Sequence, residues 1–149
     1  MTEAQMQPVS KMCFVCGVEN SHGLHLKFRI EANAVWVDFT PREEHQGWPG
    51  VAHGGIIAAL LDEVMGRTSF LLDLWVVTGT MNIRYVRPVP VGQPLSIRAE
   101  ITSTRSRAIT TRAVLTLADG VIGAEATGTY IILPDAMRQE LASRLQLVK

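Results

Sequence analysis

The sequence predicts an α+β domain in which an antiparallel sheet wraps around one long central helix, with a second helix at the C-terminus. Two observations lead to this fold class. Residues 54–61 carry no charge and are apolar or glycine throughout, which is typical of a helix that is buried on every side. On both sides of this run, several segments alternate apolar and polar residues with the period of two that half-buried strands have.

Length and composition limit the kinds of protein to consider. A chain of 149 residues suits one domain with a substantial core, so we expect a single domain over residues 1–149, with residues 1–23 as an N-terminal extension or loop. The formal net charge is zero and no basic cluster occurs, which argues against nucleic acid or an anionic membrane as a partner. The N-terminal run is polar and no apolar run could span a bilayer. We therefore expect a cytoplasmic protein with a small-molecule substrate.

The first informative segment contains Cys13 and Cys16, followed by His22 and His25. Two thiolates and two imidazoles at these spacings have the right softness to form a tetrahedral zinc site. The alternative, which we favour, is a small apolar loop packed against the core. Two cysteines so close in sequence make a poor disulfide framework and fit a reducing compartment.

The next segments predict a β-hairpin, a loop and the central helix, in that order. Residues 24–30 and 34–39 alternate and are joined by a short polar turn. Residues 40–52 contain two prolines and two glycines and form a loop of the kind that often borders a site. The helix is expected to begin after His53 and to run to about Leu72.

The second half of the chain predicts four strands and a terminal helix. The strands are expected at residues 75–86, 95–102, 109–117 and 121–133, the last two forming a long hairpin. From Pro134 onward, apolar residues recur at helical spacing and predict an amphipathic helix that contains Met137, Leu141, Leu145 and Val148.

Two carboxylates follow the uncharged run, and they differ in their local partners. Glu63 has Arg67 one turn later, the favourable order for an i, i+4 ion pair, so its role is interpreted as structural. Asp62 has Gly66 at that position and therefore no local partner. Because a buried carboxylate without a partner is costly, Asp62 is the candidate functional acid. It would act as a general base that activates water or as a nucleophile.

The start of the helix provides the complementary chemistry. The backbone N–H groups of Gly54 and Gly55, helped by the helix dipole, are suited to stabilising a developing oxyanion. His53 is able to hydrogen-bond the same carbonyl, or simply to cap the helix. Gly54 and Asp62 lie eight residues apart, about 12 Å along a helix that rises roughly 1.5 Å per residue. That is too far for both to contact one carbonyl, so a shared site requires two copies of the helix in a symmetric homodimer.

These residues, together with residues 78–92, resemble the hotdog-fold acyl-CoA thioesterases of the PaaI-like group, within the 4-hydroxybenzoyl-CoA thioesterase superfamily. Residues 13–17 and 23–26 also resemble the N-terminal segment of many such proteins. The resemblance implies a hotdog fold and dimers whose sheets pair edge to edge, often assembled into homotetramers. It implies no cofactor and no metal in the reaction.

The resemblance also assigns roles by position. Asp62 matches the catalytic acid and Gly54 or Gly55 the oxyanion donor, with His53 beside the thioester carbonyl. Thr78 falls where relatives place a Ser or Thr that helps to position the attacking water; the alternative is an ordinary strand threonine.

The substrate-binding residues are assigned in the same way. Arg87 and Pro88 resemble the strand end that borders the coenzyme A nucleotide, where a cation suits phosphate, although a solvated arginine is the alternative. One position departs from the pattern: six residues before His53, where several relatives carry Asn or Gln, this chain has Gly47, with Gln46 one position earlier. Either the loop brings Gln46 to the site or that contact is absent. Trp48 is a further candidate, as a wall of the acyl pocket.

The primary hypothesis is hydrolysis of an acyl-CoA thioester to a free acid and coenzyme A. Two alternatives remain open. One is a hydratase or dehydratase on the same fold, which would pair His53 with Asp62. The other is a non-catalytic dimer that binds acyl-CoA.

Overall fold

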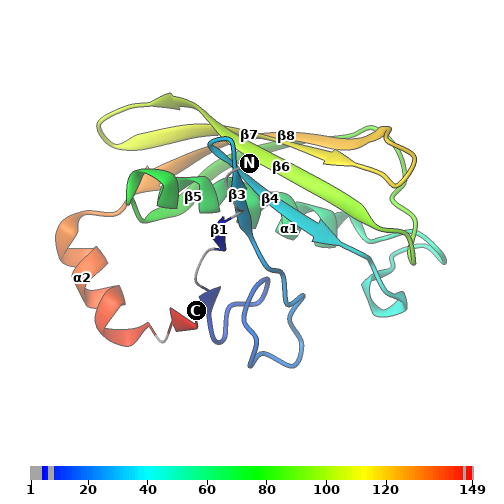
Figure 1. Cartoon of the computed structure of the whole chain (residues 1–149), viewed down its shortest axis with the longest axis horizontal. Coiled ribbons are helices and arrows are strands. Elements are labelled where there is room, and N and C mark those ends of the chain that lie inside the picture. The colour runs from blue at the N-terminus through cyan, green and yellow to red at the C-terminus, as the bar shows by residue number, and fades with distance from the viewer. Residues whose placement is uncertain (1–4, 7–8, 146, 149) are drawn as a thin grey trace.

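The computed structural model describes residues 5–6, 9–145 and 147–148 (Figure 1). None of the helices in this part of the chain is long and apolar enough to cross a membrane. In chain order, the elements are β1 (Gln5–Met6), β2 (Val9–Ser10), β3 (Arg29–Glu31), β4 (Ala34–Phe39), the 3-10 helix η1 (Glu43–His45), α1 (Gly54–Arg67), the 3-10 helix η2 (Thr68–Leu72), β5 (Val76–Tyr85), β6 (Leu95–Thr104), β7 (Ala108–Thr116), β8 (Ile122–Ile132), α2 (Asp135–Arg144) and β9 (Leu147–Val148).

The main sheet is antiparallel and has seven strands in the order β1-β3-β4-β6-β7-β8-β5. Figure 1 shows this sheet curving over α1, which lies against one face of it. The helix contacts β4, β5, β6, β7 and β8, so a single helix fills the hollow of the sheet. The predicted α+β class, with a sheet wrapped around a central helix and a further C-terminal helix, is confirmed.

The helix α1 begins and ends for local reasons. His53 has an extended backbone, and its side chain accepts a hydrogen bond from the N–H of Gly55, which satisfies one of the unpaired donors of the first turn. After Arg67 the chain tightens into η2, which stops at Asp73 in the left-handed conformation (φ 53°). The predicted end near Leu72 is therefore right, although the last turns are 3-10 helix.

The prediction that the helix is buried on every side was wrong. Ile57, Leu60 and Leu61 are fully buried beneath the sheet, whereas Gly54 and Gly55 are exposed. The uncharged run reflects two different demands: apolar side chains face the sheet, and small residues occupy the side of the helix that the sheet does not cover.

The predicted hairpin forms, but its first strand is much shorter than expected. Only Arg29–Glu31 pairs with β4, and Ala32 and Asn33 at the turn have the positive φ angles (49° and 58°) of a tight hairpin turn. The preceding residues are not a strand. Leu24 and Leu26 donate their backbone N–H groups to carbonyls of the N-terminal turn at 2.9 and 3.0 Å. Apolar and polar residues alternate here because every second side chain is buried under that turn. The same alternation is expected of a strand in a sheet, so the sequence pattern cannot distinguish the two.

The C-terminal helix also differs from its prediction. It ends at Arg144, so Leu145 lies outside it and Val148 belongs to β9, which pairs with β2. Met137 and Leu141 remain 51% and 39% exposed, because α2 runs away from the sheet (Figure 1). The apolar spacing predicted an amphipathic helix, and no residue of α2 is buried.

Candidate active site

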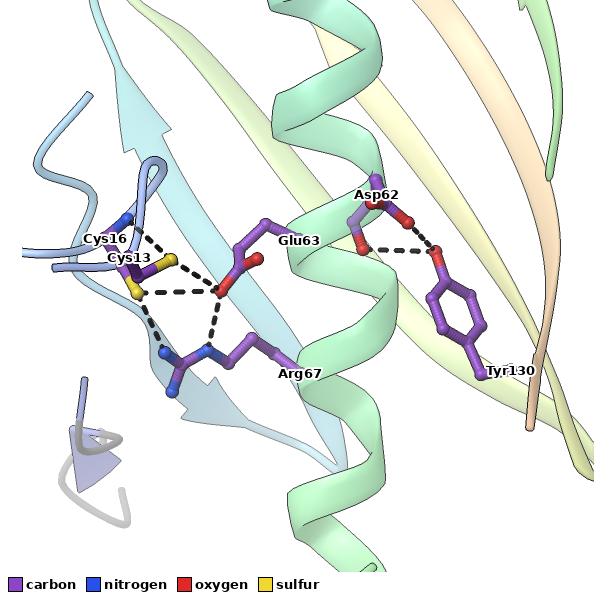
Figure 2. Close-up of polar contacts among 6 residues, drawn as sticks. All are labelled: Cys13, Cys16, Asp62, Glu63, Arg67 and Tyr130. Carbon is purple, nitrogen blue, oxygen red and sulfur yellow. Dashed lines mark hydrogen bonds and ion pairs between the residues drawn. The ribbon is translucent and has the colours of Figure 1, made fainter. Parts of the chain in front are cut away.

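Asp62 lies in the middle of α1 and is half-buried. Its Oδ1 atom accepts hydrogen bonds from the Tyr130 hydroxyl at 2.8 Å and from the Thr78 hydroxyl at 2.9 Å. The Tyr130 hydroxyl is also 3.1 Å from the backbone carbonyl oxygen of Asp62, so it holds both the side chain and its helical turn (Figure 2). Asp62 has no partner within its helix, as predicted, but the sheet supplies two from β5 and β8.

The position of Tyr130 is fixed by packing. The side chain is 1% exposed, and its ring fits against two glycines. A Cβ atom on Gly128 would lie 2.6 Å from Cε2 of the ring, and one on Gly66 would lie 3.4 Å from Cε1. Burial and the nearby carboxylates of Asp62 and Glu63 raise the pKa of Tyr130, so its hydroxyl stays protonated and donates.

A hollow of about 620 Å³ opens beside these groups. This volume falls within the roughly 300–1,000 Å³ that is usual for small-molecule sites. Asp62 and Thr78 line this hollow together with Glu63 and Arg67. Most of the surface of the hollow is apolar, and its apolar lining includes Phe70, Trp75, Leu133 and Leu141. Leu141, the exposed leucine of α2, therefore lines this hollow and is not part of the core.

At the N-terminal end of α1, His53 caps the first turn of the helix. Its Nδ1 accepts the N–H of Gly55 at 2.8 Å, which places the proton of the neutral ring on Nε2. The hydroxyl of Tyr85, from β5, donates to the carbonyl of Gly54 at 2.7 Å and ties the helix start to the sheet. A second hollow lies here and is lined by Gly47, Trp48, Val51, Ala52, His53 and Gly54.

The loop before the helix does not bring Gln46 to this second hollow. Its side-chain oxygen instead accepts the N–H of Gly50 at 3.2 Å, within the loop itself. Trp48 does line the hollow and is 82% exposed. Arg87 and Pro88 are exposed and line neither hollow. A guanidinium nitrogen of Arg87 lies 4.0 Å from a carboxylate oxygen of Asp119, the geometry of a weak surface ion pair.

The second carboxylate, Glu63, makes the predicted ion pair with Arg67 at 3.3 Å. It also meets Cys13 and Cys16, whose sulfur atoms approach the same carboxylate oxygen. The hydrogen bond between the two thiols lowers the pKa of Cys13 to about 6 and raises that of Cys16. His22 and His25 are exposed and do not join this group, so the described residues do not assemble a site of two cysteines and two histidines.

Sequence reasoning missed the two tyrosines. Tyr130 is 68 positions from Asp62, and Tyr85 is 31 positions from Gly54. Both lie in strands where an aromatic residue is ordinary, so no local spacing marks them. The signal that existed was indirect, in the glycines at positions 66 and 128 that leave space for the ring of Tyr130.

The sheet wrapped around α1 defines a hotdog-fold protein, and the comparisons with known proteins agree. The thioesterase superfamily model matches residues 49–124, and the chain belongs to this family. Human acyl-coenzyme A thioesterase THEM5 is 36% identical over 63 residues, which are 42% of this chain and 26% of that protein. The chain thus matches about a quarter of the length of this curated relative.

Two solved structures extend the comparison to the fold. A thioesterase superfamily protein is 30% identical with a TM-score of 0.76, and the match covers 81% of this chain and 60% of that one. The PaaI protein of E. coli, from the phenylacetic acid degradation operon, has a TM-score of 0.70 at 16% identity, covering 74% and 81%. The likeness to PaaI concerns the fold.

Proposed function

We propose that the protein hydrolyses an acyl-CoA thioester to a carboxylic acid and coenzyme A. The observation that carries this proposal is a half-buried carboxylate, Asp62, which lines a largely apolar hollow and whose Oδ1 is held by Tyr130 and Thr78. Both hydrogen bonds end on Oδ1, which leaves Oδ2 to accept a proton. The name of THEM5, an acyl-coenzyme A thioesterase, supports the same substrate class.

In this reaction Asp62 acts as a general base. Its Oδ2 takes a proton from water while the water oxygen bonds to the thioester carbon. The carbonyl electrons move onto oxygen, then return as the C–S bond breaks and the thiolate of coenzyme A leaves and is protonated. The same position allows direct attack by Oδ2 on the carbonyl: the C–S bond breaks, the thiolate of coenzyme A leaves, and the acyl group forms an anhydride with Asp62. Water then hydrolyses the anhydride to the free acid and regenerates the carboxylate of Asp62.

The start of α1 is our candidate for the oxyanion site. Because the N–H of Gly55 already donates to Nδ1 of His53, we assign the oxyanion to the N–H of Gly54 and to Nε2–H of His53. Gly55 then acts by fixing the tautomer of the ring. The dipole of α1 adds partial positive charge at this end of the helix.

We propose that the two halves of the site meet across a homodimer. Asp62 and Gly54 are about 12 Å apart along α1 and line different hollows. Within the described residues, β5 is a ten-residue edge strand that pairs with β8 alone, and Val77 and Tyr85 on it are 49% and 53% exposed. Long edge strands with exposed apolar side chains are usually covered. Pairing of two β5 strands would bring a second copy of α1 close to the first.

The first test is thiol release from short-, medium-, long-chain and aryl acyl-CoAs. We expect turnover of at least one class, and loss of about 10²- to 10⁴-fold in kcat for Asp62→Asn, because a general base contributes that much. Glu100→Gln is the matched control, since Glu100 makes an ordinary surface ion pair with Arg98 at 3.0 Å. No thiol release by the native protein, or an unchanged rate for Asp62→Asn, would contradict the proposal.

The second test asks whether the site is shared. Asp62→Asn and His53→Ala are each expected to be inactive, and the two variants are co-expressed with different tags. Random pairing of subunits would restore about a quarter of the native activity, because half of the pairs are mixed and each mixed pair has one intact site. No recovery in a preparation shown to contain mixed dimers would mean that each chain holds its own site.

A non-catalytic acyl-CoA-binding dimer is the second candidate function. It is favoured by the position of Gln46, whose side chain is used within the loop and adds no polar group to the helix start. Measurable affinity for acyl-CoA without thiol release would support it. The hydratase hypothesis is distinguished by consumption of crotonyl-CoA without thiol release.

A further inference from the structure

A cluster of metal-ligating groups lies beside α1 at Glu63, the residue that follows Asp62. The sulfur atoms of Cys13 and Cys16 are 3.7 and 3.6 Å from the same oxygen, Oε1 of Glu63, and the three ligand atoms all lie within 4.8 Å of one another. Cys16 is fully buried, and the Glu63 side chain is only 25% exposed. Figure 2 shows both cysteines and Glu63 converging on one side of the helix, while Asp62 points to the other side.

The turn that carries the cysteines is built to present both sulfur atoms in one direction. The N–H of Cys16 lies 3.4 Å from the sulfur of Cys13, and the N–H of Gly17 donates to the carbonyl of Cys13 at 2.8 Å. A Cβ atom at position 17 would lie 2.5 Å from backbone atoms of Lys11 and Cys13, so the close turn requires glycine. Amide hydrogen bonds to sulfur favour the thiolate, the form that binds metals.

The distances match those around a tetrahedral zinc ion. Zinc lies about 2.3 Å from thiolate sulfur and about 2.0 Å from carboxylate oxygen, so a tetrahedral angle separates these two ligand atoms by about 3.5 Å. The observed sulfur–oxygen distances of 3.7 and 3.6 Å are close to this value. Little rearrangement would be needed for both sulfur atoms and the oxygen to contact one ion.

Arg67 balances the charge of such a site. It donates to the sulfur of Cys16 at 3.0 Å and to Oε1 of Glu63 at 3.3 Å. Two thiolates and a carboxylate carry three negative charges, which one Zn²⁺ and one guanidinium together neutralise. Hydrogen bonds from outside the first shell are a usual feature of metal sites and orient the ligands.

We propose that Cys13, Cys16 and Glu63 bind one Zn²⁺ ion, with the fourth position of the tetrahedron taken by water. The set differs from the zinc ligands considered in the sequence analysis as the less favoured hypothesis, because Glu63 of α1 takes the place of His22 and His25. The ion is structural: it fastens the N-terminal turn to α1 at the residue next to Asp62. This proposal does not depend on the reaction, and binding of metal tests it without any assay of turnover.

The test is metal binding by the untagged full-length protein under reducing conditions. Metal analysis after growth with zinc is expected to give about one Zn²⁺ per chain. Titration of the metal-free protein with Co²⁺ is expected to give the near-ultraviolet absorption of cobalt–thiolate bonds. Bound zinc should also protect both thiols from a thiol reagent until a chelator is added.

Variants then identify the ligands. Cys13→Ser and Glu63→Gln are expected to lose the stoichiometric metal, whereas the double variant His22→Ala/His25→Ala should keep it. Glu100→Gln is the matched control for replacing a carboxylate by an amide. Circular dichroism of each variant checks that it is folded. If Cys13→Ser does not fold, Glu63→Gln still tests the ligand set, because glutamine has nearly the same shape as glutamate.

Three outcomes would overturn the proposal. If the reduced native protein binds neither Zn²⁺ nor Co²⁺ above the level of the Cys13→Ser variant, the cluster is only a hydrogen-bonded pair of thiols. Unchanged metal affinity in folded Glu63→Gln would remove Glu63 from the ligand set. Equal loss of metal in the double histidine variant would favour a site formed by Cys13, Cys16, His22 and His25.

Discussion

Replacing Tyr130 by phenylalanine tests how Asp62 is held. The change removes one oxygen atom, which donates to Oδ1 of Asp62 at 2.8 Å and lies 3.1 Å from its backbone carbonyl oxygen. The ring is fully packed and keeps its place, so no cavity of note is created. The perturbation is therefore confined to the hydrogen bonds of a single hydroxyl.

The expected magnitude follows from these contacts. A hydrogen bond to a charged group contributes about 1.5–3 kcal/mol, and the half-buried position of Asp62 favours the lower part of that range. If the bond orients the base in the transition state, its loss lowers kcat by roughly 10- to 40-fold, at about 1.4 kcal/mol for each tenfold step. Thr78 still donates to Oδ1 at 2.9 Å, so activity should fall without being abolished.

The assay is steady-state thiol release, with kcat and KM measured separately and thermal unfolding in parallel. We expect kcat to fall and KM to stay near the native value. Thr68→Val is the matched control, because Thr68 is fully buried and its hydroxyl donates to the carbonyl of Met65 at 2.6 Å without touching Asp62. It should cost about 1 kcal/mol of stability and leave kcat unchanged. Native kcat in Tyr130→Phe, or an equal loss in Thr68→Val, would refute the reasoning.

Three further predictions concern stability. Gly128→Ala should lower the free energy of unfolding by about 1–3 kcal/mol, because its Cβ would lie 2.6 Å from the Tyr130 ring. Gly66→Ala, whose Cβ would lie 3.4 Å from the same ring, should be neutral or stabilising. Thermal unfolding separates the two variants, and equal losses of stability would contradict the packing argument. Thr111→Val should raise the urea midpoint by an amount equivalent to about 1 kcal/mol, because the buried Thr111 hydroxyl has no hydrogen-bond partner among the described residues. A lower midpoint would show that this hydroxyl does have a partner. Burial lowers the pKa of His45 below its ordinary value of 6.5, so the unfolded chain takes up a proton more readily than the folded protein. The free energy of unfolding should therefore fall as the pH drops below about 6.5. Urea unfolding at about pH 7.5 and 5.5 should show a weaker pH dependence of this free energy in His45→Gln, and an unchanged pH dependence would exclude His45 as the cause.

Much of the fold was predictable because its determinants are local. The uncharged run at residues 54–61 located α1, and alternation located the strands from β4 to β8. The ion pair of Glu63 with Arg67 followed from one turn of helix. The errors arose where the same pattern has two physical causes. Residues 24–26 alternate because they pack beneath a turn, and Leu141 of α2 lines the hollow beside Asp62.

The candidate site divides in the same way. The sequence by itself determined which groups are chemically notable: an acid without a partner in its helix, and two glycines that open the helix behind a histidine cap. Only the tertiary structure decided what surrounds them. Tyr130 reaches Asp62 across 68 positions, and Cys13 and Cys16 reach Glu63 across 50 and 47 positions. Periodicity and i, i+4 spacing describe a residue's neighbours along one element, whereas these contacts exist because the curvature of the sheet and the path of the N-terminal turn bring distant segments against one helix.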